Sequence, residues 1–304
     1  MKIKMNSSLR SLFGAMFSGI AFFSLATMPT QAAAVKVLQF TAGATNALIT
    51  DNYIILDHPA LNGKPGLKPI ITQYWTGTYN NHPVALWYIT GANAAAGRWS
   101  IYNDDQAAMP DGAAFNVLIP NNSFTPPLAS RLDATPLNSA YSITAMSTEK
   151  GHPSAFIHFT HMWNPYPILG GIYCTNQSLG YSITSDPKSP LFNKWYIFNQ
   201  DSSLPPPATS YFIFDATKLP AGSHAVNLVH TSNSGNSSGD STEIDETGAL
   251  TGTTNVVFIT PINKTDNKPV GIYWDGNAWT IFNQDSSTFS LDQKFNILFF
   301  PSTN

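Results

Sequence analysis

An internal repeat constrains the fold of this chain more than any other feature of its sequence. Three segments share the pattern W-x-I-[YF]-N-[DQ]-D, at residues 99–105, 195–201 and 279–285. Similar segments that recur along a chain indicate copies of one supersecondary unit, each of which buries its apolar face against its neighbours. We therefore expect three tandem repeats, at residues 35–120, 121–218 and 219–304.

The segments that flank this pattern are typical of β-strands. They are short runs rich in β-branched and aromatic residues, bounded by Gly, Pro, Asn and Asp. No helical period is sustained beyond residue 34, so the sequence predicts an all-β fold of three antiparallel, sandwich-like repeats packed on one another, with about four to five strands each. The expected strands are 70–72, 83–88, 99–103 and 115–119 in repeat 1; 157–160, 170–174, 195–199 and 211–214 in repeat 2; and 257–260, 269–274, 279–283 and 295–300 in repeat 3.

The turn before the shared tryptophan differs between the repeats. In repeat 3, Asp275-Gly276 lies between two apolar runs, which predicts a type I′ hairpin. Repeat 2 has a longer segment here, residues 175–194, which we interpret as an insertion at the hairpin tip. Hairpin tips tolerate insertions because they lie at the surface.

The first 34 residues read as a secretory signal peptide. Lys2, Lys4 and Arg10 precede an apolar run at residues 12–25, and small residues at 32–34 provide a cleavage site. The apolar run is short for a transmembrane helix, and we expect no membrane-spanning segment in the mature chain. The sequence therefore predicts an exported protein, periplasmic or extracellular.

Charge is scarce in this chain. Only 11% of its residues are charged, against about 25% in an average domain, and its net charge is −3. An acidic, sparsely charged chain lacks the basic surface of a nucleic-acid-binding protein, so we expect no nucleic-acid partner. The single cysteine, Cys174, excludes an intramolecular disulfide and sites built from several thiolates. Few acids and bases remain for catalysis, which weighs against an enzyme.

The polar ends of the shared pattern are the first candidate binding site. A cluster of amides and carboxylates beside a tryptophan could hold Ca²⁺ or a sugar hydroxyl. The same side chains also cap strand ends by accepting hydrogen bonds from nearby backbone N–H groups, and the sequence favours this second interpretation. The residues concerned are Asn103 and Asp105, Asn199 and Asp201, and Asn283 and Asp285.

Two further patterns resemble a metal site and a catalytic serine, but their surroundings in the sequence favour neither. His158 and His161, with His152 nearby, suggest a metal site, but strand residues three apart point to opposite faces. Residues 235–239 match G-x-S-x-G, yet they lie in a Ser/Asn/Gly-rich loop and not between a strand and a helix. We therefore predict no catalytic residue, no metal site and no cofactor.

Loop tryptophans are the second candidate binding site. Trp75 and Trp163 each follow the first strand expected in their repeat, close to other aromatic and amide side chains. Such residues suit contacts with a sugar or a protein, but they also cover the ends of β-sandwiches. Both interpretations stay open.

The repeated block resembles a domain of unknown function that recurs in uncharacterised secreted bacterial proteins. The resemblance rests on the W-x-I-F-N-Q-D pattern and the F-N-V-L strand after it, and it covers nearly the whole mature chain. Repeat 3 keeps most of the strand blocks, whereas repeat 2 departs most. The resemblance implies no known activity. Repeat 1 also carries Asn62-Gly63-Lys64-Pro65, Met109-Pro110-Asp111-Gly112 and Phe115-Asn116-Val117.

These observations support two functional hypotheses. The first is a secreted, non-catalytic binding or envelope protein whose partner is a carbohydrate or an envelope protein; a purely structural envelope component shares its sequence features. The second is a secreted hydrolase whose active site lies between repeats. His and Asp side chains that meet in a cleft between repeats would favour the second hypothesis.

Overall fold

The computed structural model describes residues 34–92, 94–121, 129–133, 135–137, 141–143, 154–163, 179–189, 192–203, 209–246, 252, 254–263 and 266–301. Residues 33–304 form one compact unit. Apart from one short 3-10 helix, η1 (Ala216–Lys218), the regular structure in the described segments is β-strand. The predicted all-β fold is therefore confirmed. No helix among the described residues is long and apolar enough to span a membrane.

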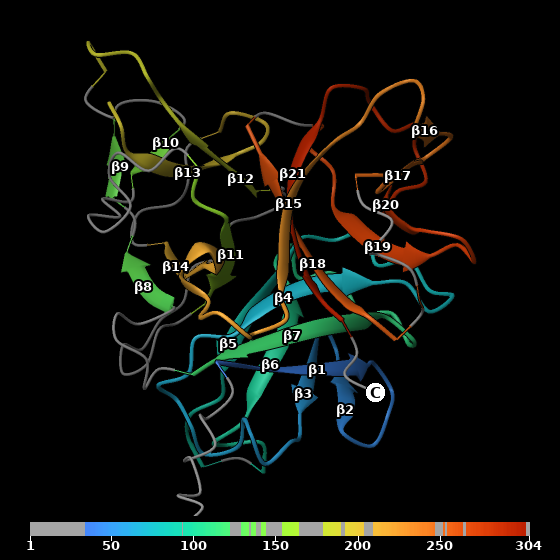
Figure 1. Ribbon diagram of the computed structural model, residues 1–304. Helices are drawn as coiled ribbons and strands as arrows, with labels where there is room; N and C mark the ends of the chain where they lie inside the picture. Colours follow the sequence, from blue (N-terminus) through green and yellow to red (C-terminus); the bar gives the residue numbers. More distant parts are fainter. Residues whose placement is uncertain are drawn as a thin grey trace, which may run out of the picture. The chain divides into compact units, whose positions relative to one another are not determined.

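Among the described residues, each repeat contributes seven strands, more than the sequence predicts, because a first strand and a small hairpin precede the expected ones. Figure 1 shows the arrangement of these strands. Repeat 1 contains β1 (Val35–Thr41), β2 (Ala47–Thr50), β3 (Tyr53–Leu56), β4 (Ile70–Tyr74), β5 (Val84–Tyr88), β6 (Trp99–Asn103) and β7 (Ala114–Pro120). Repeat 2 contains β8 (Ala129–Asp133), β9 (Thr135–Leu137), β10 (Tyr141–Ile143), β11 (Ile157–Met162), β12 (Leu179–Ile183), β13 (Trp195–Asn199) and β14 (Ser210–Asp215). Repeat 3 contains β15 (Val226–Thr231), β16 (Ser237–Ser238), β17 (Ser241–Glu243), β18 (Val256–Ile262), β19 (Val270–Trp274), β20 (Trp279–Asn283) and β21 (Lys294–Phe300).

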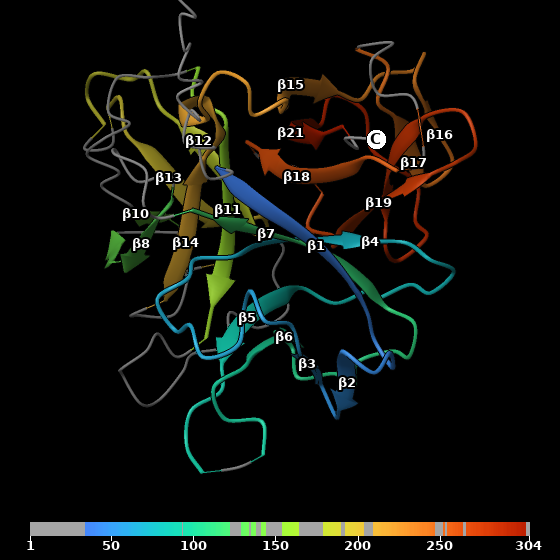
Figure 2. The ribbon, with the colours of Figure 1, turned by 60° about the horizontal axis from the view of Figure 1, so that its bottom comes forward.

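The three sheets are each shared by two repeats. Within a repeat, the first, last and fourth strands form a three-stranded group, such as β15, β21 and β18 in Figure 2. The other four strands form a second group, which joins the three-stranded group of the next repeat. The resulting sheets have the orders β1-β7-β4-β19-β20-β17-β16, β2-β3-β6-β5-β11-β14-β8 and β15-β21-β18-β12-β13-β10-β9.

Parallel strand pairs join the repeats, whereas the pairs within each repeat are antiparallel. We call these junctions seam 1–2 (β5 with β11), seam 2–3 (β12 with β18) and seam 3–1 (β19 with β4). Because repeat 3 pairs with repeat 1, the three seams close a ring of strand pairing. The sequence predicts that the repeats pack on one another, but not that they share sheets.

Strands β4, β11 and β18 meet where the repeats converge. Each carries a buried threonine at the same place: Thr72, Thr160 and Thr260, here called the central threonines. The backbone N–H of Ile71 donates to Thr160 Oγ1 at 3.0 Å, and that of Ile259 donates to Thr72 Oγ1 at 3.2 Å. These bonds satisfy buried backbone donors across repeat boundaries.

The asparagine of the F-N-V-L strand also connects repeats. Asn116 Nδ2 donates to the carbonyl of Val257 at 2.9 Å, and Asn296 Nδ2 donates to the carbonyl of Ile157 at 3.2 Å. The register with the central threonines places Phe212 at this position in repeat 2. Repeat 2 therefore lacks this bond, consistent with its greater departure from the pattern.

The tryptophan and isoleucine of the shared pattern lie in the core. Trp99 and Trp279 are fully buried and Trp195 nearly so, and the strand β6 that begins at Trp99 is buried along its whole length. Trp99 Nε1 donates to the carbonyl of Lys64 at 3.1 Å, in the Asn62-Gly63-Lys64-Pro65 turn. In repeat 1 the tryptophan therefore fills the core and also holds this turn.

The structure corrects the prediction of which segment of repeat 2 pairs with the W-x-I-x-N strand. The partner of β13 is β12, Leu179–Ile183, which lies inside the range assigned to an insertion, 175–194. The connection between β12 and β13 is thus residues 184–194. The segment 170–174, which includes Cys174, lies outside the described residues. The repeat boundaries themselves stay a prediction.

The hairpin turn of repeat 3 also differs from its prediction. A type I′ turn needs positive φ at both central residues, but only Gly276 has one, at 107°. Instead, Asp275 Oδ1 accepts hydrogen bonds from the backbone N–H groups of Asn277 and Ala278, each at 2.7 Å. The aspartate side chain thus organises a four-residue turn between β19 and β20.

Candidate functional site

The middle residue of each Asn-[Asp/Gln]-Asp segment lies buried at a seam. Gln284 Nε2 is 3.4 Å from Gln73 Oε1 at seam 3–1, and Gln200 Nε2 donates to the carbonyl of Asn263 at 3.3 Å at seam 2–3. At seam 1–2 the corresponding residue is Asp104, which faces His161. The sequence analysis did not single out these three positions, although they connect the repeats.

The strand that faces this middle residue is shaped to receive it. A Cβ atom on Gly271 would lie 2.5 Å from Gln284 Nε2, and one on Gly180 would clash with the side chain of Gln200. Repeat 1 has Ala85 at the register position of these glycines, together with the shorter Asp104 in place of glutamine. Glycine therefore accompanies glutamine in the two repeats that carry it.

A small cavity of about 120 Å³ lies where the repeats converge. The central threonines line it, together with Asp104, His161 and Lys268. His161 Nδ1 lies 3.0 Å from Asp104 Oδ2, and both side chains are at most 3% exposed. A histidine and an aspartate from different repeats thus form a buried pair beside three hydroxyl groups.

A second cavity, the aromatic cleft, lies at seam 3–1. It has a volume of about 170 Å³ and is lined by Trp75 and Tyr79 of repeat 1 and by Asp240, Tyr273 and Phe282 of repeat 3. The ring centroids of Trp75 and Tyr273 are 5.7 Å apart, and those of Tyr79 and Phe282 are 5.6 Å apart, in edge-to-face contacts. Tyr79 is 44% exposed, so this wall of the cleft is open to solvent.

Trp75 and Trp163 occupy the same place in two seams. Each directly follows the central strand of its repeat, and its backbone N–H donates to the neighbouring repeat at 2.9 Å, to Ile272 and Leu86 respectively. The ring of Trp163 packs edge-to-face on Trp87, with centroids 4.8 Å apart. The sequence predicted two loop tryptophans; the structure places each against the next repeat.

Seam 2–3 has polar side chains where the other two have aromatic rings. Asn263 takes the place of the tryptophan, and Ser182 Oγ donates to its Oδ1 at 2.7 Å. Of the described cavities, the aromatic cleft at seam 3–1 therefore has the character of a ligand site: concave, aromatic and supplied with one carboxylate.

Comparison with known proteins agrees with the repeat. A family model described as "Domain of unknown function (DUF7452)" matches residues 15–119, 92–185 and 187–299, which together span most of the chain. The chain belongs to this family. No curated protein and no solved structure matches it. The seams described above are therefore contacts between DUF7452 repeats.

The predicted Asn and Asp residues hold the loop after the third strand of each expected set. Each asparagine is buried, and its Nδ2 donates to loop carbonyls four or five residues ahead, as Asn103 does to Ala107 at 3.1 Å. Each aspartate accepts from the backbone N–H two residues ahead, at 3.1, 2.8 and 2.9 Å for Asp105, Asp201 and Asp285. All three copies of the W-x-I-[YF]-N-[DQ]-D pattern thus contain the capping bonds, whereas Ca²⁺ or sugar binding at these residues stays a prediction.

The charge of one capping aspartate is stabilised locally. Partial burial acts to raise the pKa of Asp285, but hydrogen bonds from Ser287 and the nearby Lys268 outweigh it and lower this pKa below its usual value. The carboxylate of Asp285 is therefore ionised at neutral pH.

The two described histidines of repeat 2 contact different repeats. His158 Nδ1 lies 2.9 Å from Thr260 Oγ1 in repeat 3, whereas His161 faces Asp104 of repeat 1. Burial lowers the pKa of His158 to about 3, so its imidazole is neutral. His152 lies outside the described residues. The expectation that these side chains point apart is met for His158 and His161.

The G-x-S-x-G match does not form a nucleophile elbow. Residues 235–239 comprise a turn and the two-residue strand β16, with a turn and not a helix after it. Ser237 Oγ donates to Asn236 Oδ1 at 3.1 Å. Through Asn236 this serine belongs to a polar network that includes Thr242 and His230.

Proposed function

We propose that this protein is exported and binds carbohydrate without catalysis, and that the aromatic cleft at seam 3–1 is its binding site. The observation that carries the proposal is the grouping of Trp75, Tyr79, Tyr273 and Phe282 with the carboxylate of Asp240 around one cavity. Aromatic rings present flat apolar faces to the C–H groups of a sugar, and a carboxylate accepts hydrogen bonds from its hydroxyls.

The size of the cleft defines the mode of binding. Pockets for drug-sized ligands measure about 300–1,000 Å³, and this cleft is smaller, at about 170 Å³. A cleft of that volume suits a single sugar ring, with the rest of an oligosaccharide outside it. A protein partner would instead need a broad interface of about 800 Å² on each side.

A glycan array tests this proposal with the chain from residue 34 onward. We expect the wild-type chain to bind a defined set of glycans on the array. Tyr79→Ala and Asp240→Asn, which alter exposed or polar groups, should bind the same glycans at least tenfold more weakly. The matched control is Phe192→Ala, because Phe192 is an aromatic residue exposed to a similar extent, 40%, outside the cleft. Failure of the wild-type chain to bind any glycan would remove carbohydrate as the ligand.

The tryptophan variants extend the test to both aromatic seams. Trp75→Ala removes the inner wall of the cleft, and Trp163→Ala removes the corresponding ring of seam 1–2. We expect the first variant to lose binding and the second to retain it, because the described cleft is at seam 3–1. Circular dichroism of both variants verifies that they fold.

The hydrolase hypothesis also has a specific observation in its favour. His161 and Asp104 meet in a cavity between repeats, beside threonine hydroxyls that could act as nucleophiles. Both side chains are almost fully buried, however, and a substrate needs access to the reacting groups. Assays with chromogenic glycosides and esters decide between the hypotheses: turnover that Asp104→Asn abolishes would favour the hydrolase, and no turnover is expected for a binding protein.

A further inference from the structure

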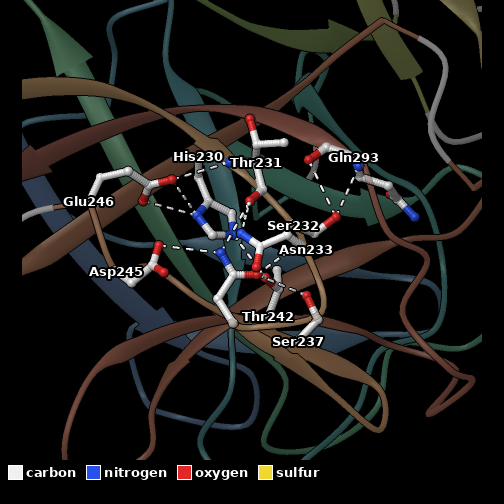
Figure 3. A network of polar contacts seen from close by, with 10 residues as sticks. His230, Thr231, Ser232, Asn233, Ser237, Thr242, Asp245, Glu246 and Gln293 are labelled. Carbon is white, nitrogen blue, oxygen red and sulfur yellow. Dashed lines mark hydrogen bonds and ion pairs between the residues drawn. The ribbon is translucent and has the colours of Figure 1, made fainter.

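A buried histidine in repeat 3 faces two carboxylates from another sheet. His230 lies on β15 and is fully buried, whereas Asp245 and Glu246 follow β17 (Figure 3). His230 Nδ1 is 2.8 and 2.9 Å from the two carboxylate oxygens of Glu246. Ligand atoms of His230, Asp245 and Glu246 all lie within 4.8 Å of one another.

The hydrogen bonds around Asn236 determine which nitrogen of His230 carries a proton. The backbone N–H of Asn233 donates to Asn236 Oδ1 at 2.7 Å, and Asn236 Nδ2 donates to the carbonyl of Thr231 at 3.1 Å. The amide orientation is therefore settled, because a flip would set the amide nitrogen against one backbone N–H and the amide oxygen against two acceptors, the Thr231 carbonyl and Asp245 Oδ1. The hydroxyl of Thr242, 3.1 Å from Asn236 Oδ1, must then donate to that oxygen.

The same hydroxyl can only accept from His230. Thr242 Oγ1 lies 2.9 Å from His230 Nε2, and its single proton is already engaged with Asn236. Hence Nε2–H donates to Thr242, which leaves Nδ1 as the ring nitrogen that faces the Glu246 carboxylate. A cation, either a proton or a metal ion, can be held between this nitrogen and the carboxylate oxygens.

We propose that His230 Nδ1 and the carboxylates of Asp245 and Glu246 bind a divalent transition-metal ion of the Zn²⁺ class. Imidazole with carboxylates suits borderline ions such as Zn²⁺, whereas Ca²⁺ and Mg²⁺ require oxygen ligands. Three protein ligands and one open position match a common zinc geometry.

Both carboxylates must shift for the site to hold the ion, because ligand atoms that lie up to 4.8 Å apart must come closer together. Ligand atoms of a tetrahedral zinc ion lie about 3.3 Å apart, given Zn–N and Zn–O bonds of about 2.0–2.2 Å. The Nδ1–carboxylate distance of 2.8 Å must therefore open by about half an ångström. Asp245 and Glu246 are exposed and can move, while the buried imidazole is held by Thr242, as metal-binding histidines are held through their second nitrogen.

The bound ion would connect the two sheets that repeat 3 contributes to. β15 belongs to the sheet of β21 and β18, and β17 to the sheet of β20 and β19. Repeat 1 has the fully apolar Phe40 at the position of His230, as the matching register with Phe115 and Phe295 indicates. The ion would thus be specific to repeat 3, where a polar residue replaces a core phenylalanine.

Calorimetric titration of the untagged chain from residue 34 onward with ZnCl₂ tests the proposal, together with the visible absorption of bound Co²⁺. We expect one equivalent of Zn²⁺ to bind, a rise in Tm with Zn²⁺, and the absorption of a four-coordinate Co²⁺ site. Glu246→Gln and Asp245→Asn alter exposed side chains and should each weaken binding at least tenfold.

Glu243→Gln is the matched control, because Glu243 lies on β17 outside the group of ligands. We expect it to bind Zn²⁺ as tightly as the wild type. Absence of Zn²⁺ binding would overturn the proposal and leave a proton between His230 and Glu246. Zn²⁺ binding that survives both Glu246→Gln and Asp245→Asn would overturn it too, because the ion would then occupy another place.

Discussion

Replacement of a central threonine by valine tests whether the repeats depend on their shared centre. Thr160→Val keeps the shape of the side chain but removes the hydroxyl that accepts the backbone N–H of Ile71 at 3.0 Å. Ile71 is buried, so its N–H would be left without its protein acceptor. An unsatisfied buried donor costs about 1–3 kcal/mol, and we expect the free energy of unfolding to fall by this amount.

Urea-induced unfolding of the chain from residue 34 onward measures this change. Thr50→Val is the matched control, because Thr50 is exposed at the end of β2 and should change stability by less than about 0.5 kcal/mol. Thr72→Val removes the acceptor of Ile259 at a different junction and should also lower the free energy of unfolding. Because both threonines line one cavity, the departure of the double variant from the sum of the two effects measures their coupling. A change in Thr160→Val no larger than that in Thr50→Val would refute the role assigned to the central threonines.

Two further predictions concern packing and pH. Gly271→Ala places a Cβ 2.5 Å from Gln284 Nε2 and 2.8 Å from the Phe282 ring, so urea unfolding should give a loss of about 1–3 kcal/mol, whereas Gly66→Ala, which meets open space, should be nearly neutral. His158 binds a proton near pH 6.5 when unfolded but only near pH 3 when folded, so the unfolded state binds more protons between these values and stability should fall by up to about 1.4 kcal/mol for each pH unit below 6.5. His158→Phe should reduce this slope in unfolding curves measured from pH 7 to 4; an unchanged slope would contradict the assignment.

The sequence predicts the content of each repeat better than the contacts between repeats. The W-x-I-x-N strand can be recognised from the sequence, because apolar residues lie on both of its faces and the pattern recurs in all three repeats. A seam joins residues such as Gln73 and Gln284, which no local pattern relates. Period-2 alternation and turn residues report on local conformation, so they could not indicate which strand edges pair in parallel.

The same limit explains the misplaced strand of repeat 2. The segment 170–174, which lies outside the described residues, has the apolar composition of a strand, whereas β12 contains Gly180, a residue type that is depleted in strands. Gly180 is favoured there because the side chain of Gln200 occupies the space of a Cβ. Tertiary packing thus outweighs intrinsic propensity at this strand.

The candidate sites divide in a similar way. Trp75 and Trp163 could be selected from the sequence because aromatic loop residues are few and positioned alike in two repeats. Their partners Tyr273 and Trp87 could not, because these belong to neighbouring repeats. His230 was missed because it lies in an ordinary strand pattern, and its carboxylate partners follow about fifteen residues later.

Differential scanning calorimetry of the chain from residue 34 onward tests the central claim most directly, that the three repeats form one structure through closed seams. We expect a single unfolding transition whose calorimetric and van't Hoff enthalpies agree, because no repeat retains complete sheets once a neighbour unfolds. Separate transitions, one for each repeat, would contradict the closed ring of seams and the aromatic cleft that depends on it.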